Sequence, residues 1–451
     1  MGGDSPFAAA STPGGISAIA VLRFSGCGCR KIFKEIFSRD PCPRVATFAP
    51  YRNRAGIHLD DVVVTYFFGP TSYTGEDLVE ISCHGNPSIV HRILEDLYGR
   101  GCRPAEPGEF TRTAFLNGKL DLAQAEAVAD LIHARSEAAL AFARQQLDGS
   151  LGRELSPQVS ILVDLLATVE AHIDFSEEEP TAPVLTLQRN LDPVRRTLEK
   201  LLGTLRHRHH VEKGVAVAFM GAPNAGKSTL WNGFLGRERA LVSPIAGTTR
   251  DFLEEEIFLG PWNLRIIDTA GLRETDDELE ALSMERSREK IIGADLLLWV
   301  IDGSGPLDRA LSSREEWWSH RSSGILILSK RDLPATIGRD HPFLREIGWP
   351  TVEISARRPE DIESLKCFLI KYLTEKDLIP NEEQVLVNQR QAEHLREAVA
   401  ALAVAETLSL EKGELVAAEL RRALDALATI TGEKIDGVIL DRIFGKFCIG
   451  K

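Results

Sequence analysis

Short, mainly apolar runs recur in the middle of the chain and predict the buried strands of a parallel sheet. They are residues 215–220, 264–267, 325–328 and 351–354. A strand that is covered on both faces has a nearly continuous apolar run instead of an alternating one. Segments of helical character separate these runs, and this alternation is typical of an α/β sheet. We therefore predict an α/β domain over residues 211–376.

Helical spacing of apolar residues dominates the chain on both sides of this domain. Leu122, Ala125 and Ala129 recur every three or four positions, which predicts an amphipathic helix. Similar spacing is found in residues 156–175, in a stretch that ends near residue 205, and in residues 388–430. The simplest interpretation is one all-α helical domain, made of residues 119–210 and 377–451, which the α/β domain interrupts as an insertion.

The first 118 residues differ from both of these parts. Strand-like runs at residues 19–23 and 62–67 are separated by segments rich in glycine and proline. Short strands between turn residues indicate a small sheet with attached helices. We predict an N-terminal α+β domain over residues 1–118, and thus a multidomain chain.

Composition and charge limit the cellular compartments and the classes of binding partner that suit this chain. The hydrophobic fraction of 43% is ordinary for a water-soluble protein. We see no apolar run of the roughly 18 residues that a membrane span needs, and no secretory leader. Seven scattered cysteines suit a reducing cytosol. The net charge of −13 argues against nonspecific coating of nucleic acid but allows a local basic site. These features predict a cytoplasmic protein without a membrane partner.

Two small clusters have both a structural and a functional interpretation. The Cys-Gly-Cys sequence at residues 27–29 has no second cysteine pair at the spacing of a zinc site, so we expect no metal there. Residues 206–210, Arg-His-Arg-His-His, form the densest basic cluster. We expect a solvated linker at this cluster, with a metal or RNA contact as the alternative.

The most specific motif follows the first apolar run of the α/β domain. Residues 221–228 read Gly-Ala-Pro-Asn-Ala-Gly-Lys-Ser, the pattern of a phosphate-binding loop that opens a helix. Its glycines let backbone N–H groups surround the phosphates, Lys227 reaches the β- and γ-phosphates as a catalytic group, and Ser228 binds Mg²⁺. The expected nucleotide contacts are Asn224, Ala225, Gly226, Lys227, Ser228 and Thr229.

Three further motifs follow in order and indicate a guanine nucleotide. Thr249 supplies a second oxygen to Mg²⁺, and Asp268 ends a strand at which it holds Mg²⁺ through water. Asp332 accepts both N–H donors of guanine, which adenine cannot offer, so the expected substrate is GTP. The other expected nucleotide contacts are Thr269, Ala270, Gly271, Ser329, Lys330, Ser355 and Ala356.

One residue of the base-binding motif departs from the usual pattern. Ser329 stands where GTPases usually have asparagine. Because one hydroxyl makes fewer hydrogen bonds than an amide, this loop is tied less firmly to the phosphate loop. We expect Asp332 to preserve the selectivity for guanine while the affinity for the nucleotide falls.

The means of hydrolysis is also unusual. Many GTPases place a water-orienting glutamine at the position that Leu272 occupies here. Asn224 and the carbonyl groups of residues 243–248 can instead bind K⁺, which would neutralise charge that develops on the phosphates. Glu274 and Glu280 follow and could hold water. Their position alone favours exposed charges on a switch helix.

Motifs along the whole chain resemble the MnmE family, also called TrmE, of bacterial tRNA-modification GTPases. They are residues 73–77 (Tyr-Thr-Gly-Glu-Asp), 120–127 (Leu-Asp-Leu-Ala-Gln-Ala-Glu-Ala), 268–274, and 447–451 (Phe-Cys-Ile-Gly-Lys). The resemblance implies a K⁺-activated GTPase that forms a homodimer through its N-terminal domain. With the flavoprotein MnmG, such a protein installs a carbon-5 (carboxymethyl)aminomethyl group on the wobble uridine of certain tRNAs. The implied one-carbon donor is 5-formyl- or methylene-tetrahydrofolate, held in the N-terminal domain.

The resemblance also implies site residues. They are Arg23, Glu80, Lys119 and Lys451 for folate, Asn224, Ser243, Ile245 and Thr248 for K⁺, and Ser228 and Thr249 for Mg²⁺. The cations suit the glutamate carboxylates of folate, and Glu80 suits the amine donors of the pterin. The family usually has threonine at the position of Ser243, whose carbonyl or hydroxyl should serve equally. Glu280 matches the family's water-positioning glutamate and becomes a candidate catalytic residue.

Cys448 is a further candidate catalytic residue with two interpretations. Its thiolate could attack uracil and so activate carbon 5, or it could be a small buried cysteine in the helical domain. Two rival functions also stay open: a GTPase switch in ribosome assembly that only hydrolyses GTP, and a scaffold with a degenerate nucleotide site. The first leaves the N-terminal domain and residues 447–451 unexplained, and the second conflicts with the intact phosphate and Mg²⁺ motifs.

Overall fold

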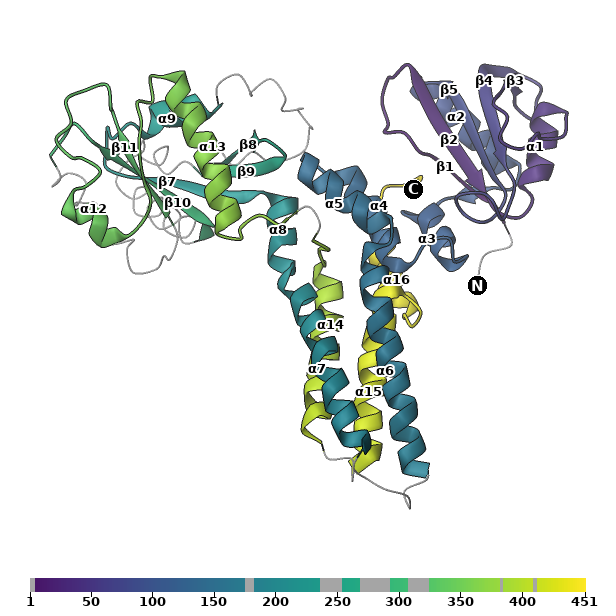
Figure 1. Cartoon of the computed structure of the whole chain (residues 1–451). Helices are drawn as coiled ribbons and strands as arrows, with labels where there is room; N and C mark the ends of the chain where they lie inside the picture. The colour runs from purple at the N-terminus through teal and green to yellow at the C-terminus, as the bar shows by residue number, and fades with distance from the viewer. Residues whose placement is uncertain are drawn as a thin grey trace, which may run out of the picture. The chain divides into compact units, whose positions relative to one another are not determined.

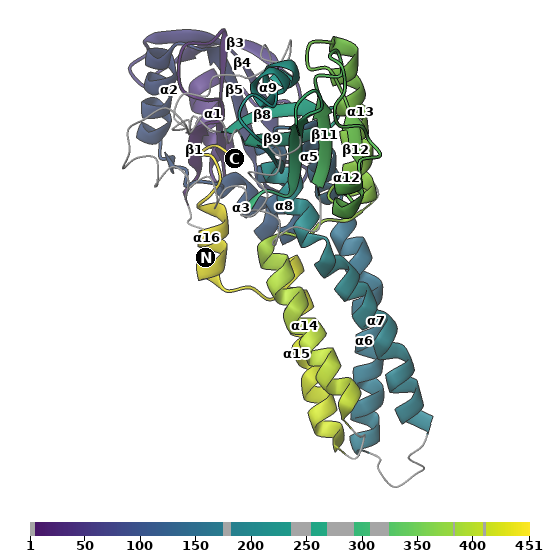
Figure 2. The same cartoon turned by 90° about the vertical axis from the view of Figure 1, so that its left-hand side faces the viewer.

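The computed structural model describes most of the chain as two compact units. The described residues are 5–174, 182–235, 254–267, 293–306, 324–381, 384–408 and 412–451. The first unit contains residues 1–133, 143–200 and 389–451, and the second contains residues 134–142 and 201–388. Figure 1 and Figure 2 show the elements of each unit from two sides.

A six-stranded sheet forms the N-terminal part, in the order β3-β4-β5-β2-β1-β6. Its strands are β1 (Phe7–Ala10), β2 (Ile19–Ser25), β3 (Thr47–Arg52), β4 (His58–Phe67), β5 (Leu78–His84) and β6 (Arg103–Pro104). Only β1 and β6 are parallel. Helices α1 (Cys29–Phe37) and α2 (Pro87–Gly99) share one apolar core with the sheet, to which they contribute Phe33 and Leu97. Both strands predicted in this part are confirmed.

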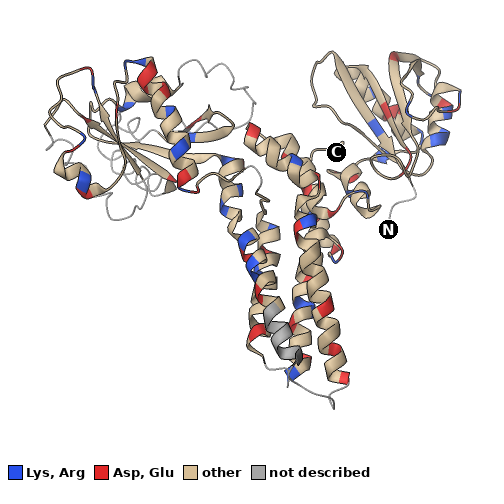
Figure 3. Ribbon diagram, viewed as in Figure 1, with Lys and Arg blue, Asp and Glu red and all other residues tan. Residues whose placement is uncertain are grey.

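Two segments that are far apart in the sequence make up the helical part. Its helices are α4 (Leu122–His133), α5 (Glu137–Leu147), α6 (Ser150–Asp174), α7 (Ala182–Gly203), α14 (Gln389–Thr407), α15 (Gly413–Thr431) and α16 (Gly437–Phe444). Helix α3 (Glu109–Leu116) precedes them and belongs to the N-terminal part, since its Phe110 shares a core with Phe7 and Leu78 of that sheet. Helix α15 packs against both α6 and α14. Two ion pairs join the segments, Arg421 with Glu170 at 2.6 Å and Arg195 with Glu406 at 3.1 Å. Figure 3 shows that basic and acidic residues are interspersed along these helices. In the described residues, no helix has the length and apolar character to cross a membrane.

A mostly buried ion pair fastens α4 to the second helical segment. Arg390 Nε lies 2.7 Å from Glu126 Oε1, and the Gln391 amide donates to the other oxygen of this carboxylate at 3.0 Å. Arg390 also donates to the carbonyl oxygens of Thr429 and Ile430 at the end of α15. A buried ion pair is tolerated when its remaining polar atoms are also bonded. This network therefore fixes α4, α14 and α15 together.

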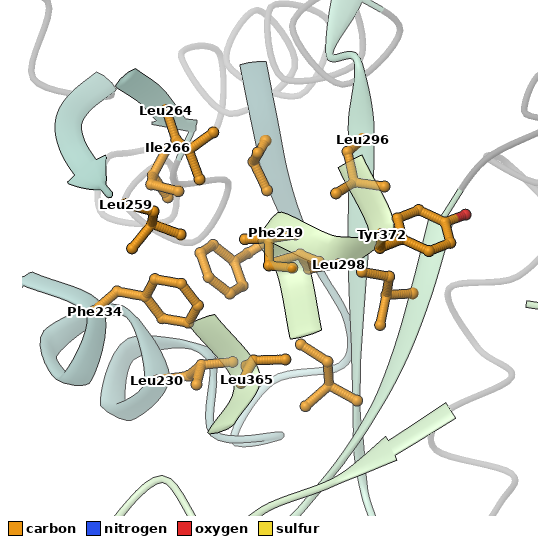
Figure 4. Packing of buried hydrophobic residues seen from close by; sticks show 14 of the residues in the cluster. Phe219, Leu230, Phe234, Leu259, Leu264, Ile266, Leu296, Leu298, Leu365 and Tyr372 are labelled. Atoms are coloured by element: carbon orange, nitrogen blue, oxygen red, sulfur yellow. The ribbon is translucent and has the colours of Figure 1, made fainter. Parts of the chain in front are cut away.

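The α/β part contains a second six-stranded sheet, in the order β12-β11-β10-β7-β9-β8. Its strands are β7 (Val215–Met220), β8 (Glu254–Leu259), β9 (Trp262–Ile267), β10 (Leu296–Asp302), β11 (Gly324–Ser329) and β12 (Thr351–Glu353), and only β8 is antiparallel. Helices α9 (Lys227–Leu235) and α13 (Pro359–Glu375) share a core with one face. In Figure 4, Phe219 lies close to Phe234 of α9, with ring centroids 5.9 Å apart. The four predicted strands are confirmed.

The predicted fold class is confirmed as well. The chain combines an N-terminal α+β part, an all-α helical part and an inserted α/β sheet of the parallel type. The boundaries at residues 118, 210 and 376 stay predictions.

The prediction of a solvated linker at residues 206–210 is wrong. These residues lie in helix α8 (Leu205–Lys213), in which His207 and His210 are buried. The sequence has the i, i+3 spacing of one helix face, so both rings point to the same side of α8. His207 Nε2 bonds the Asp377 carbonyl oxygen at 2.9 Å, and His210 Nδ1 bonds the Leu378 carbonyl oxygen at 2.7 Å. The histidines thus fasten the chain segment that enters the α/β sheet to the segment that leaves it.

His210 also binds a carboxylate at the start of β10. Its Nε2 lies 3.0 Å from Asp295 Oδ1, and Asp295 Oδ2 accepts the Ala216 N–H at 2.9 Å. Burial would raise the pKa of Asp295, but the hydrogen bonds from His210 and Ala216 outweigh it and leave this pKa below its usual range. The carboxylate therefore contributes stability above its usual pKa of about 4, and loses it as the pH falls through the lowered pKa.

We expect Asp295→Asn to lower the free energy of unfolding by about 1–3 kcal/mol at neutral pH, since it removes a charged hydrogen-bond acceptor from a mostly buried site. Thermal unfolding of the full chain should show a lower midpoint at pH 7 and a smaller difference from the wild type toward pH 3. The matched control is Asp340→Asn, which removes an exposed partner of Arg345. Equal midpoints for the Asp295 variant and the wild type at pH 7 would contradict the assignment.

Candidate functional site

The phosphate loop, residues 221–228, joins β7 to α9 by a turn that requires glycine. Gly221 has a φ of +144°, and a Cβ at this position would lie 2.1 Å from the Val300 carbonyl oxygen. Gly226 and Asn224 also have left-handed backbones, with φ of +98° and +64°. A residue with a Cβ could not approach the Val300 carbonyl oxygen so closely without strain. The loop therefore brings the N-terminus of α9 to the carboxyl end of β7, the usual position of an anion site.

Lys227 and Ser228 begin α9, as the motif predicts. The Lys227 ammonium donates to the carbonyl oxygens of Gly221 at 2.7 Å and Ala222 at 2.8 Å. Ser228 and Thr229 are exposed at the start of the helix. The ammonium, the hydroxyls and the first N–H groups of α9 can together bind a polyphosphate and its metal ion.

Ser329 keeps one link between the base-binding loop and the phosphate loop. The residue is buried at the end of β11, and its hydroxyl lies 2.5 Å from the Ala225 carbonyl oxygen and 3.1 Å from that of Ile301. A hydroxyl has one proton and donates to one acceptor at a time. The link is therefore a single hydrogen bond.

Asp332 is held by the loop that follows β12. Ser355 is fully buried, and its hydroxyl donates to Asp332 Oδ1 at 2.7 Å, while Arg357 lies 3.9 Å from Oδ2. The hydrogen bond from Ser355 is the main reason that the pKa of Asp332 lies below its usual range. Asp332 therefore stays ionised and can accept the two N–H groups of a guanine edge. Ala356, next to Ser355, is partly buried.

Asp302 is a residue of this region that the sequence analysis missed. It ends β10, directly opposite Ser329 in the sheet, and its Oδ2 accepts from Lys330 Nζ at 2.6 Å. A signal was present in the sequence: Asp302 follows the apolar run at residues 296–301. Polar groups at the carboxyl ends of parallel strands commonly line ligand sites.

The other predicted residues of the nucleotide site lie outside the described residues. They are Ser243, Ile245, Thr248, Thr249, Asp268, Thr269, Ala270, Gly271 and Glu280. Their roles in binding K⁺, Mg²⁺ and the phosphates, and in positioning water, stay predictions.

The tail, residues 448–451, runs along the N-terminal part. It is held by hydrogen bonds from Gly108 N to Cys448 O (3.3 Å), from Phe110 N to Lys451 O (3.1 Å) and from Ser11 Oγ to Gly450 O (3.0 Å). Gly450 has a φ of +91°, and a Cβ there would lie 2.3 Å from the Ala10 carbonyl oxygen. Only glycine allows this approach. The tail therefore reaches the sheet in one defined path.

Three of the four predicted folate residues meet where the tail docks, and we call Arg23, Glu80 and Lys451 the tail site. Arg23 on β2 is directly opposite Glu80 on β5, and Arg23 Nε donates to Glu80 Oε1 at 2.8 Å. Burial lowers the pKa of Lys451, and the charge of nearby Arg23 lowers it further, while Cys448 and Glu80 oppose them. Two cations therefore lie near one carboxylate, and this excess of positive charge favours an anionic ligand.

Lys119, the fourth predicted folate residue, is exposed just after α3. In the described part of the chain no hydrogen bond or ion pair joins its side chain to Arg23, Glu80 or Lys451, and its role in binding folate stays a prediction. Tyr73, which had been given no role, lies near Arg23 of the tail site. Its hydroxyl bonds Thr111 Oγ1 at 2.9 Å. Burial raises the pKa of Tyr73, and the hydrogen bond with Thr111 and then the charge of Arg23 oppose that rise.

Cys448 is exposed, so the interpretation as a small buried cysteine is wrong. The carbonyl groups of Cys448, Gly450 and Lys451 are bonded to the N-terminal part, so the tail carries the Cys448 side chain to the surface of that part. Its role as a nucleophile stays a prediction.

We expect Glu80→Gln to lower the pKa of Lys451 further, because the carboxylate at present opposes burial and Arg23. The ammonium would then lose its proton at a lower pH, and less positive charge would remain for an anion. An NMR titration of ¹³C-methylated lysines, with Lys451→Arg to assign the signal, measures this pKa. The control is Glu95→Gln, which changes an exposed carboxylate on α2. An unchanged or higher pKa in the Glu80 variant would show that the two groups are not coupled.

Comparisons with known proteins cover nearly the whole chain. A profile of the "MnmE helical domain" matches residues 122–448, and one of the "GTP-binding protein TrmE N-terminus" matches residues 6–119. The tRNA modification GTPase MnmE of Opitutus terrae is 44% identical over 450 residues, or 98% of both chains. That of Aquifex aeolicus is 40% identical over 455 residues, or 99% of both chains.

One solved structure with limited similarity is the G domain of the T. maritima FeoB iron transporter. It is 26% identical and covers 35% of this chain and 98% of its own, with a TM-score of 0.27. The family assignment does not depend on it, because the two profiles and the full-length relatives already span both the N-terminal and the helical parts. The chain belongs to the MnmE family of tRNA modification GTPases.

Proposed function

We propose that this tRNA modification GTPase works with the flavoprotein MnmG to install a carbon-5 (carboxymethyl)aminomethyl group on the wobble uridine of certain tRNAs. The one-carbon unit comes from 5-formyl- or methylene-tetrahydrofolate, which binds at the tail site. The observation that carries this proposal is the meeting of Arg23, Glu80 and Lys451, because no property of a simple GTPase switch requires it.

The chemistry of the tail site supports an anionic ligand that also has amine donors. Arg23 and Lys451 are suited to the carboxylates of a folate glutamate, and Glu80 is suited to the amine and ring N–H groups of its pterin. Burial is the main reason that the pKa of Lys451 is lowered, and the positive charge of Arg23 lowers it further. A bound carboxylate would offset the excess positive charge of Arg23 and Lys451.

GTP would bind in the α/β part. The phosphate loop cradles the phosphates, and Asp332, held ionised by Ser355, accepts the guanine edge. Ser228 and Thr249 hold Mg²⁺. Asn224, Ser243, Ile245 and Thr248 hold K⁺, which would offset charge on the phosphates during hydrolysis. Glu280 positions the attacking water, and Cys448 stays a candidate nucleophile of the modification.

The family suggests the partners and the place of action. The protein would act in the cytoplasm as a homodimer that pairs through its N-terminal domain, and its macromolecular partners would be MnmG and tRNA. A homodimer places two tail sites and two nucleotide sites in one assembly.

We expect Arg23→Ala to weaken the binding of 5-formyltetrahydrofolate by at least about tenfold, the scale of a lost charge-assisted hydrogen bond. Isothermal titration calorimetry measures this directly. GTP hydrolysis should continue, since Arg23 lies in the other compact unit. Arg92→Ala, an exposed change on α2, is the matched control. Equal folate affinity in wild type and Arg23→Ala would reject the tail site as the folate site.

The function itself is tested by mass spectrometry of wobble nucleosides in tRNA from cells that lack the protein. We expect the carbon-5 group to be absent, to return with the wild-type chain, and to return incompletely with Arg23→Ala. Unchanged nucleosides would instead favour the ribosome-assembly switch, whose only chemistry is GTP hydrolysis.

A further inference from the structure

Lys330 is held in an uncommon conformation by a close charged contact. Its backbone has a φ of +61°, in the left-handed region that residues other than glycine rarely adopt. Its ammonium lies 2.6 Å from Asp302 Oδ2, and both side chains are about two-thirds buried. Left-handed backbones persist at functional sites when their surroundings hold them there. The contact with Asp302 therefore fixes the direction of the Lys330 side chain.

Asp302 is itself firmly placed. It ends β10, where it pairs with Ser329 of β11, and its second oxygen accepts from both the N–H and the hydroxyl of Ser304, at 3.0 and 2.7 Å. Partial burial would raise the pKa of Asp302, but the hydrogen bonds from Lys330 and Ser304 outweigh it and hold this pKa below its usual range. The carboxylate thus stays charged and has a full set of partners.

The need for such a contact follows from Ser329. This residue provides a single hydrogen bond between the base-binding loop and the phosphate loop. The side-chain amide of an asparagine at this position would have two N–H donors and one oxygen acceptor with which to join the two loops. Lys330 directly follows Ser329 in the base-binding loop. The contact between Asp302 and Lys330 therefore holds this loop next to the position at which serine makes fewer hydrogen bonds than asparagine would.

We propose that Asp302 is a positioning residue for guanine-nucleotide binding, which holds Lys330 in place beside Asp332 before the nucleotide arrives. The proposal rests on the proposed nucleotide site. A side chain that is already ordered loses less conformational entropy when the ligand binds, so Asp302 increases affinity. In the described residues, no hydrogen bond or ion pair joins the Asp302 side chain to the phosphate loop, and its partners are Lys330 and Ser304. Asp302 should therefore affect the affinity for nucleotide and leave the hydrolysis step largely as it is.

The test is a double-mutant cycle on the full-length chain, read out as the dissociation constant of a fluorescent GDP analogue. We expect Asp302→Ala to weaken binding by about tenfold, as for a lost charge-assisted hydrogen bond. Lys330→Ala should weaken it at least as much. In the Lys330→Ala background, Asp302→Ala should then add less than about twofold, because the residue acts through Lys330. The Michaelis constant for GTP should rise in Asp302→Ala, with kcat close to the wild type.

Controls separate this role from a general loss of structure. Asp340→Ala removes an exposed carboxylate in the same part of the chain and should leave the dissociation constant unchanged. Asp302→Asn, which keeps an acceptor for Lys330, should recover part of the affinity. An unchanged affinity in Asp302→Ala would overturn the inference, and so would an equal loss in both backgrounds. If the wild type itself binds no guanine nucleotide, the proposed nucleotide site fails first and the inference fails with it.

Discussion

The docking of the tail on the N-terminal sheet is the constraint on which the tail site depends. Arg23 and Glu80 meet because β2 and β5 are neighbours, but Lys451 joins them only after the chain has passed through the helical part and returned. The return path has little freedom, because Gly450 passes so close to Ala10 that a single Cβ would block it. The network of Arg390 and Glu126 fixes the end of α15, which precedes α16 and the tail. Folding of the helical part is thus a condition for a complete site on the N-terminal part.

The nucleotide site is built on a different principle. Its residues come from the ends of neighbouring strands, so the sheet alone brings them together: the phosphate loop follows β7, Asp302 ends β10, and Ser329 ends β11. Buried apolar strands fix where these ends lie, and the polar residues beyond them face the same edge. The two sites therefore differ in robustness. One depends on local strand order, and the other on contacts between distant parts of the chain.

This difference explains how much could be predicted from the sequence. The apolar runs and the phosphate loop specify the α/β sheet and its functional edge through local pattern alone. No spacing rule links Arg23 to Lys451, and their grouping came from the family resemblance. Lys119 was grouped with them on the same ground, and its role in binding folate stays a prediction.

The histidines of α8 show a limit of another kind. A cluster of basic residues reads as solvated, yet His207 and His210 are buried because both find carbonyl oxygens as partners. Hydrogen-bond partners supplied by a segment more than a hundred residues away are invisible to composition and periodicity. Asp302 could be suspected from the apolar run before it, but its contact with Lys330 could not be predicted, because only the sheet register brings the two side chains together.

The bonds from α8 to residues 377 and 378 also bear on how the chain tolerates so large an insertion. A second link, from Val387 N to Thr204 Oγ1 at 3.2 Å, lies in the same region. Entry and exit of the α/β part are therefore side by side. Because its two ends are held together, the folded insertion connects the two helical segments as a short loop would. Contacts within the insertion therefore offset the entropy cost of closing so long a loop. Replacement of the α/β part by another domain, in evolution or by protein engineering, would have to reproduce these hydrogen bonds between its two ends.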